Sequence, residues 1–286
     1  MHDGETESGA RQPADLIQAA KVVHLGAHHG PGTARPPEPI GAIDERLVSL
    51  VAPNSLEAEQ YRALRHVLEE RRAEMPVIAV TSATSGEGKT TTAINLAAAM
   101  AQDAEARVLL VDADLRAPSV APLLGLGDSL PGLAELALGS RAGLDDTVRW
   151  CPPSRLCVLP AGRTPANPYE VLKSAGIGEV IQAARRRYDA VVVDTPPLLP
   201  VPDNRALAKW VDGFLLVVAA HRTPRHLLEE GLRVLEHARV AGIVFNGDDR
   251  PSSACYGYYY GYGRGRGGGA ARGEHPAWRK AAAPWR

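Results

Sequence analysis

Cysteine and long apolar runs are scarce in this chain of 286 residues. Its three cysteines do not make a disulfide framework, so we expect a reducing, cytoplasmic environment. No run reaches the roughly 18 apolar residues that a membrane-spanning helix needs, and residues 1–12 lack the apolar stretch of a signal peptide. We therefore expect no direct insertion into a membrane.

The chain also lacks an excess of charge of either sign. Its 32 Lys and Arg residues face 33 Asp and Glu residues, for a formal net charge of −1. This balance argues against a protein that binds nucleic acid through its overall field. Hydrophobic residues make up 45% of the chain, which is ample for a buried core.

Three compositional zones follow one another along the chain. Residues 1–45 carry many Gly, Pro, His and Ala residues, and we expect a flexible arm. Residues 46–250 have the pattern of a globular domain. Residues 251–286 include the segment CYGYYYGYGRGRGGG, a low-complexity composition that cannot build a core, so we expect a disordered tail.

Apolar runs alternate with helical patterns inside the globular zone. The expected strands are uninterrupted Val, Leu and Ile runs, which indicates burial on both faces as in a parallel sheet. They span residues 77–82, 107–112, 156–160, 190–194, 213–219 and 242–246. The expected helices span residues 54–71, 90–101, 168–187, 204–209 and 224–237. This order predicts a doubly wound α/β fold with a mainly parallel sheet.

The first expected strand ends in a phosphate-binding loop pattern. Glycines allow successive backbone N–H groups to turn inward around phosphates, Lys89 would reach the β- and γ-phosphates, and the Thr90 hydroxyl would bind Mg²⁺. A chance Gly-Lys-Thr turn is the alternative, but the flanking strand and helix favour an NTP site. The expected nucleotide-binding residues here are Thr84, Ser85, Gly86, Glu87, Gly88, Lys89, Thr90 and Thr91.

Three aspartates follow two other expected strands. Asp112 and Asp114 lie at the end of one, and Asp194 lies at the end of the other. Ligands of open α/β sheets bind outside the carboxyl ends of the strands, so these carboxylates are expected to converge on one Mg²⁺–phosphate centre. Any one of them alone is as well explained as a helix cap.

Three segments together resemble the nucleotide motifs of bacterial tyrosine autokinases, the BY-kinases linked to capsule and exopolysaccharide export. These are SATSGEGKTT, LLVDADLRAP and YDAVVVDTPP. The segments EQYRALR and LPAG and the pair Asn167-Pro168 extend the resemblance, which is shared more distantly with MinD/ParA ATPases. Ala83, Ala117 and Gly247 depart from residues that are common in relatives.

The resemblance implies a mechanism that uses ATP and Mg²⁺. It implies that Asp114 and Asp194, with Thr90, hold the metal, and that Asp112 is the base for an incoming tyrosine. It also places Asn246 near the adenine. Positioning and charge neutralisation are expected to matter more than proton abstraction, because phosphoryl transfer has a loose transition state.

Five of the eight tyrosines gather in the glycine-rich tail, where no core would place them. The kinase resemblance makes them the expected phosphate acceptors. A bland low-complexity tail and a nucleic-acid arm using Arg264 and Arg266 are the alternatives. The expected acceptors are Tyr256, Tyr258, Tyr259, Tyr260 and Tyr262.

Glu59, Arg62 and Arg65 are spaced three apart on an expected helix, so they form one stripe. The resemblance places this stripe in the subunit interface of a homo-oligomeric ring; a solvated face is the alternative. It also implies a stand-alone cytoplasmic kinase, recruited to the inner face of the membrane by a polysaccharide co-polymerase that activates it.

Two other functions remain open at this point. A MinD/ParA-like organising ATPase shares the fold and the aspartates, but it carries a second lysine early in the phosphate loop, where this chain has Thr84. A catalytically silent ATP-binding scaffold of the export machinery would keep every nucleotide residue.

Overall fold

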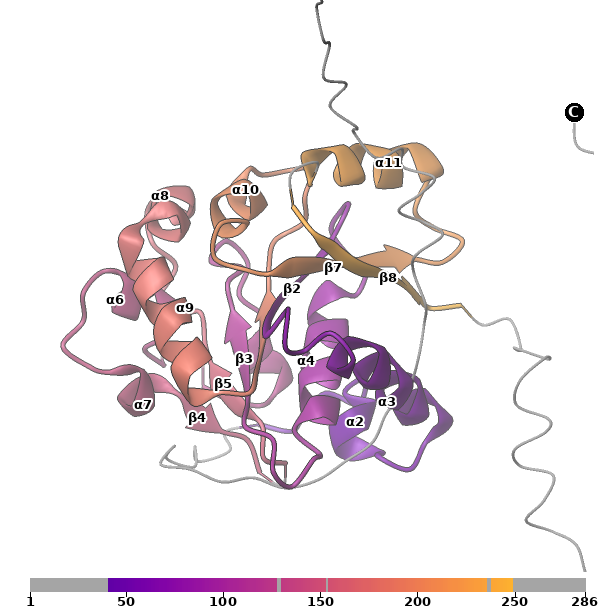
Figure 1. The fold of residues 1–286 in the computed structure, drawn as a ribbon, viewed down its shortest axis with the longest axis horizontal. Coiled ribbons are helices and arrows are strands. Elements are labelled where there is room, and N and C mark those ends of the chain that lie inside the picture. Colours follow the sequence, from indigo (N-terminus) through magenta and orange to yellow (C-terminus); the bar gives the residue numbers. More distant parts are fainter. Residues whose placement is uncertain (1–40, 128–129, 153, 236–237, 249–286) are drawn as a thin grey trace, which may run out of the picture. The chain divides into compact units, whose positions relative to one another are not determined.

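The computed structural model describes residues 41–127, 130–152, 154–235 and 238–248. Its centre is a seven-stranded sheet with the order β4-β5-β3-β6-β2-β7-β8 (Figure 1). Neighbouring strands are parallel, except that β4 and β5 are antiparallel. The strands are β2 (Val77–Ser82), β3 (Val108–Asp112), β4 (Arg149–Trp150), β5 (Cys157–Leu159), β6 (Ala190–Asp194), β7 (Gly213–Ala219) and β8 (Val240–Asn246). The predicted doubly wound, mainly parallel fold is confirmed.

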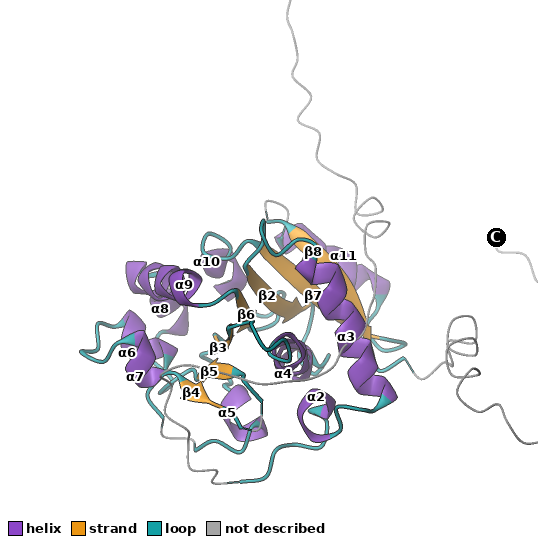
Figure 2. Ribbon diagram, turned by 60° about the horizontal axis from the view of Figure 1, so that its bottom comes forward, coloured by secondary structure: helices purple, strands orange, loops and turns teal. Residues whose placement is uncertain are grey.

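Helices cover both faces of this sheet, which is why its strands are apolar without alternation (Figure 2). Along β2, Val77 and Ala79 contribute to one hydrophobic cluster, whereas Ile78 and Val80 contribute to the other. The second cluster includes residues of α2 (Val48–Val51), α3 (Leu56–Glu69), α4 (Lys89–Met100) and α5 (Val120–Leu123). The first includes residues of α6 (Leu133–Ala137), α7 (Leu144–Thr147), α8 (Pro168–Lys173), α9 (Ala175–Arg187), α10 (Asp203–Leu207) and α11 (Arg225–Val234).

The register of the parallel strands brings two predicted site residues together. Asp112, the last residue of β3, pairs with Asp194, the last residue of β6. β2 lies on the other side of β6, with Val80 opposite Asp194. The phosphate-binding loop leaves β2 two residues later, so the loop and both carboxylates share one edge of the sheet.

Helix α4 begins in this loop and is almost wholly buried. Its buried residues include the run from Thr92 to Met100, and small alanines let it lie close to the sheet. The positive end of its dipole therefore points to the edge where the acids meet.

Several elements differ from the sequence prediction. The expected helix 168–187 is divided into α8 and α9 at Ser174, whose ψ of 156° is extended. The break lets α9 approach α6 closely, since a Cβ on Gly176 would lie 2.1 Å from the carbonyl oxygen of Ala137. The short elements α2, α5, α6, α7 and β4 were not predicted, because two to five residues carry no readable period.

At the start of the described chain, two backbone hydrogen bonds hold residues that the sequence assigned to the arm. Gly41 N–H donates to Gly125 O, and Asp44 N–H donates to Leu123 O. Residues 1–40 of the predicted arm (1–45) and the whole predicted tail (251–286) lie outside the described residues. Within the described ranges, no helix is long and apolar enough to cross a membrane.

Candidate active site

The phosphate-binding loop is shaped by two glycines in left-handed backbone conformations. Gly86 has a φ of 78° and Gly88 a φ of 89°, which other residues rarely adopt. At Gly88 the space is also closed, because a Cβ would lie 2.0 Å from Nδ2 of Asn246. The sequence therefore needs glycine here for two reasons, and the loop that results precedes the N-terminus of α4, a favourable place for phosphate.

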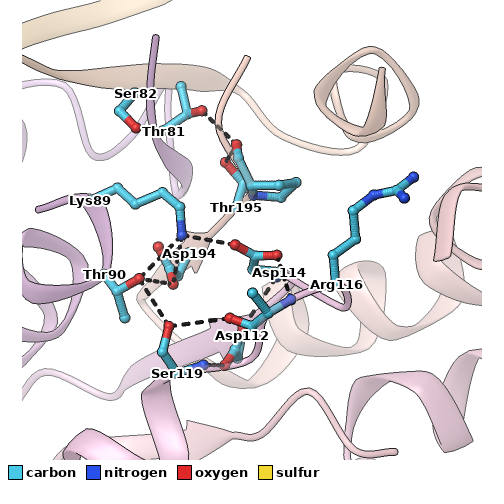
Figure 3. Close-up of polar contacts among 12 residues, drawn as sticks. Thr81, Ser82, Lys89, Thr90, Asp112, Asp114, Arg116, Ser119, Asp194 and Thr195 are labelled. Atoms are coloured by element: carbon cyan, nitrogen blue, oxygen red, sulfur yellow. Dashed lines mark hydrogen bonds and ion pairs between the residues drawn. The ribbon is translucent and has the colours of Figure 1, made fainter. Parts of the chain in front are cut away.

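Lys89 lies between two of the predicted carboxylates (Figure 3). Its Nζ is 2.8 Å from Oδ2 of Asp114 and 4.0 Å from Oδ2 of Asp194. Thr90 joins the same group, because its hydroxyl donates to Oδ2 of Asp194 at 2.7 Å. The structure thus brings together four of the five side chains that the sequence placed around one Mg²⁺–phosphate centre; the fifth is Asp112.

Burial shapes the protonation of these groups. Asp194 is fully buried, which raises its pKa to about 6, although the charge of Lys89 and the bond from Thr90 oppose the rise. Burial lowers the pKa of Lys89, but the charges of Asp194 and Asp114 raise it further, so the net shift is upward. The lysine therefore stays charged beside this acidic cluster.

Asp112 has a different environment from its neighbours. Its carboxylate accepts three backbone N–H groups, from Asp114, Ser119 and Val120, each at 3.1 Å. The side chain is 1% exposed, and its burial and the charge of Asp194 raise its pKa to about 8. These contacts fold the loop between β3 and α5; the role of base stays a prediction.

A cleft of about 630 Å³ opens above this cluster. Of the predicted site residues, Ser85, Gly86, Gly88, Lys89, Thr90, Thr91 and Asp114 line it. Thr84, Glu87, Asp112, Asp194 and Asn246 are not among its lining residues. Asp194 still contacts the cluster, because it accepts a hydrogen bond from Thr90 and lies 4.0 Å from Lys89. The side chains of the other four contact the loops that surround the cleft.

Glu87 supports the loop from behind. It is 4% exposed, and its Oε1 accepts hydroxyl bonds from Thr84 at 2.7 Å and Thr223 at 2.9 Å. Asn246 adds a third tie, as its amide donates to the backbone oxygen of Glu87 at 2.9 Å. The side chains of Glu87 and Asn246, predicted to face the nucleotide, thus connect the loop to β8 and to the segment after β7.

Sequence reasoning missed four polar residues of the cleft region, among them Arg46, which lines the cleft and pairs with Asp44. Arg116 lines the cleft and forms a two-pronged ion pair with Asp203, with Nε 2.7 Å from Oδ2 and Nη2 2.9 Å from Oδ1. Ser119 also lines it, with its Oγ 3.4 Å from Oγ1 of Thr90. Arg116 and Ser119 follow the D-x-D pair directly, which was the available signal; no local signal marked Asp203.

The oxygen ligands present fit Mg²⁺ better than a softer metal. Thr90, Asp114 and Asp194 offer a hydroxyl and two carboxylates. Among the residues that the structure describes, none forms a hydrogen bond with the buried Oδ1 of Asp194. Within the described ranges, no group of three or more His, Cys, Asp or Glu residues is placed to hold a metal by itself. Such a partial ligand set is typical of Mg²⁺, which keeps waters and binds substrate phosphates.

The three residues of the predicted interface stripe on α3 do not share the same surroundings. Arg65 is turned inward: its Nη1 donates to the carbonyl oxygen of Ala99 in α4 at 3.2 Å, and it pairs with Glu69. Glu59 and Arg62 pair with each other at 3.0 Å and have 35% of each side chain exposed. The interface remains a prediction, and the tail tyrosines that it would present lie outside the described residues.

The fold and the cleft define a class: a nucleotide-binding protein with a phosphate-binding loop and acids at the ends of neighbouring parallel strands. Residues 78–251 match the CobQ/CobB/MinD/ParA nucleotide binding domain family. The chain is 34% identical to the tyrosine-protein kinase YwqD of Bacillus subtilis (strain 168), over 76% of this chain and 92% of that protein.

Two further likenesses agree. The chain is 35% identical to the succinoglycan biosynthesis transport protein ExoP of Rhizobium meliloti (strain 1021), over 82% of this chain and 30% of ExoP. Its structure resembles the kinase domain of the Escherichia coli tyrosine kinase ETK, with a TM-score of 0.69 and 26% identity over 87% of this chain and all of that domain. The chain belongs to the family of bacterial tyrosine-protein kinases.

Proposed function

We propose that this chain is an ATP-dependent tyrosine autokinase that phosphorylates its own tail, at Tyr256, Tyr258, Tyr259, Tyr260 and Tyr262, in trans within a ring. The observation that carries the proposal is the meeting of Lys89, Thr90, Asp114 and Asp194 at one cleft, in a chain that also holds a tyrosine cluster. Membership of the tyrosine-kinase family supports the choice of acceptor.

Lys89 is well placed to neutralise the negative charge of the phosphates during transfer. Its ammonium pairs with Asp114 and lies near Asp194. The β- and γ-phosphates of ATP would attract the same ammonium, and the backbone N–H groups of the loop and the N-terminus of α4 would add further donors. Thr90, Asp114 and Asp194 would hold Mg²⁺, which supplies neutralisation of the charge that develops on the phosphate oxygens.

Asp112 and Glu87 support this centre indirectly, because each holds one of its loops in place. Asp112 fixes the loop that carries Asp114 and Ser119, and Glu87 fixes the phosphate-binding loop. A precise arrangement matters here because a loose transition state is stabilised mainly by positioning and charge. The proposal therefore does not depend on Asp112 acting as a base.

In the cell, we propose that the kinase regulates polymerisation and export of an exopolysaccharide or capsule. The support is the name of its relative ExoP, a succinoglycan biosynthesis transport protein. Recruitment to the inner face of the membrane and activation by a membrane co-polymerase belong to the same proposal. No direct contact with nucleic acid is proposed, since the chain has a net charge of only −1.

The test is incubation of the full chain with Mg-ATP, with and without a partner's cytoplasmic segment, followed by intact-mass spectrometry. We expect stepwise phosphate gains that map to residues 256–262 and are absent from Lys89→Met. Hydrolysis without phosphotyrosine would contradict the proposal in favour of an organising ATPase. Binding of ATP without either activity would favour a scaffold.

Transfer in trans can be separated from transfer in cis by mixing two variants. One is Lys89→Met with its tail intact, and the other has an intact site and phenylalanine at the five tail tyrosines. We expect phosphate on the Lys89→Met chain, because only the other chain can transfer it. No phosphate in the mixture, with normal autophosphorylation of the unmodified chain, would show transfer in cis.

A further inference from the structure

The mouth of the cleft is walled by two proline-bearing loops. Five of its eighteen lining residues are prolines: Pro118, Pro122, Pro196, Pro197 and Pro200. The first two, with Leu123, belong to the segment after β3, and the other three, with Val201, belong to the segment after β6. We call these two segments the proline walls. Together they make the outer cleft apolar, next to the charged cluster of Lys89 and Asp114.

The two proline walls are tied to each other and to the sheet. Arg116, just before the first wall, forms its two-pronged pair with Asp203, just after the second, and the Asp203 side chain is fully buried. The second wall is also anchored where it begins, because the carbonyl oxygen of Pro196 accepts from Asn204 at 2.7 Å and from Thr81 at 2.9 Å. Proline also restricts the backbone of both walls, which line the same cleft.

The cleft thus has a polar part and a mostly apolar part. Lys89, Thr90 and Asp114 contribute the polar part, which we call the phosphate end. Pro122, Leu123 and Pro200 contribute the apolar part (with residues 122 and 200 exposed), and Arg46 also lines the cleft. Asn246 and Thr223, which contact Glu87, are not lining residues.

A matching occupant has a flat apolar body and a hydroxyl at its tip. A tyrosine side chain has both: its ring can lie against proline rings, and its hydroxyl can point toward the phosphate end. Serine or threonine would bury almost nothing between the walls. Arg116, whose side chain is 38% exposed, adds a planar cation on which an aromatic ring can stack.

We propose that the proline walls, held at their spacing by Arg116 and Asp203, form the subsite that selects an aromatic acceptor. This inference rests on the proposed function, because it assigns the part of the same cleft that receives the tyrosine. The walls act on the acceptor and not on the nucleotide, so their removal should separate the two in kinetic measurements.

The first test uses the full chain with alanine at the five tail tyrosines, so that its own tail does not compete. The acceptor is a peptide of residues 254–263. Pro122→Ala and Pro200→Ala, one from each wall, are expected to raise the KM for the peptide about tenfold, and the KM for ATP should not change. Pro131→Ala, an exposed proline that does not line the cleft, is the matched control.

The second test measures whether an aromatic ring without a hydroxyl binds to the proposed subsite. The same peptide with phenylalanine at every tyrosine should inhibit competitively against the acceptor and not against ATP, and the version with alanine should not inhibit. An active enzyme whose KM for the peptide is unaltered in both wall variants, or which both peptides inhibit equally, overturns the subsite alone. Absence of Lys89-dependent transfer to any peptide overturns the proposed function, and the subsite with it.

Discussion

The three aspartates of this site have different roles although they are the same type of residue. Asp112, Asp114 and Asp194 each lie at the end of a strand or just after one. Asp114 faces the cleft and pairs with Lys89, whereas Asp112 accepts hydrogen bonds from three backbone N–H groups. Asp194 is buried, and one of its carboxylate oxygens has no hydrogen-bond partner within the described part of the chain. The chemistry of each carboxylate is thus decided by its contacts, which permits tests that separate them.

Asp112 provides the first of these tests. Asp112→Ala is expected to lower the free energy of unfolding by about 3 kcal/mol, because three backbone N–H groups lose their acceptor. Asp112→Asn keeps an accepting oxygen but cannot act as a base; we expect it to recover most of the stability and keep activity within about tenfold. Urea unfolding and initial rates measure the two effects. A normally stable Asn variant with a loss of about a thousandfold in rate would show a base instead.

The two described cysteines give a test of burial. Burial raises the pKa of the Cys151 thiol to about 11 and also raises the pKa of Cys157. At pH 8 only about one Cys151 thiol in a thousand is ionised, so neither should react with a thiol reagent in the folded protein. A Cys255→Ser variant removes the third thiol, and urea should expose the other two. Fast labelling of the folded variant would contradict this burial.

The sequence predicted those parts of the site that depend only on the order and direction of the strands. Asp112 and Asp194 meet because parallel strands end at one edge, which follows from the strand pattern. The direction of the Glu87 side chain was not predictable, because a loop motif does not say which side chains lie behind it. The Arg116–Asp203 pair spans 87 residues, and nothing local marks it.

At the scale of secondary-structure elements, α3 is attached to α4 by a side chain that the stripe pattern assigned to an interface. Arg65 contacts Ala99 O, Glu69 and Asp103, with 18% of its side chain exposed. Spacing showed correctly that Arg65 lies on one stripe with Glu59 and Arg62. It could not show where α4 lies around that stripe, and this decides which members face inward.

Arg65→Ala is therefore expected to destabilise the fold. The lost hydrogen bond to α4 and the partly buried ion pairs should cost about 1–2 kcal/mol in the free energy of unfolding. Arg225→Ala is the matched control, because Arg225 also forms an i,i+4 pair, with Glu229, but is 84% exposed; it should cost less than about 0.5 kcal/mol. Equal losses in urea unfolding would show that the bond to α4 contributes nothing.

The secondary structure was predictable in proportion to the length of each pattern. The strands at residues 77–82, 190–194 and 213–219 have the predicted bounds, because a strand covered on both faces gives a continuous apolar run. The division of residues 168–187 at Ser174 was missed, because the residues on either side keep a helical pattern and only packing against α6 requires the break.

At the scale of the whole molecule, the proposed ring joins a charged active site to an acceptor from another copy. The site holds three aspartates, Asp112, Asp114 and Asp194, with Lys89 beside the last two. A neutral tyrosine meets little electrostatic resistance there. A phosphotyrosine brings about −1.5 to −2 charges into the same place, so the product should leave more readily than the acceptor.

This asymmetry predicts that autophosphorylation dissociates the ring. Light scattering of the full chain should report an oligomer before phosphorylation and a smaller species after it, because a tail carrying several phosphates is repelled from its neighbour's acidic site. Lys89→Met given the same Mg-ATP should keep its size, and a tyrosine phosphatase should restore the larger form. Arg62→Glu, which reverses a half-exposed charge of the predicted interface, should give the smaller form without any phosphate. A phosphorylated sample as large as the unmodified one would mean that the tail's charge does not control assembly.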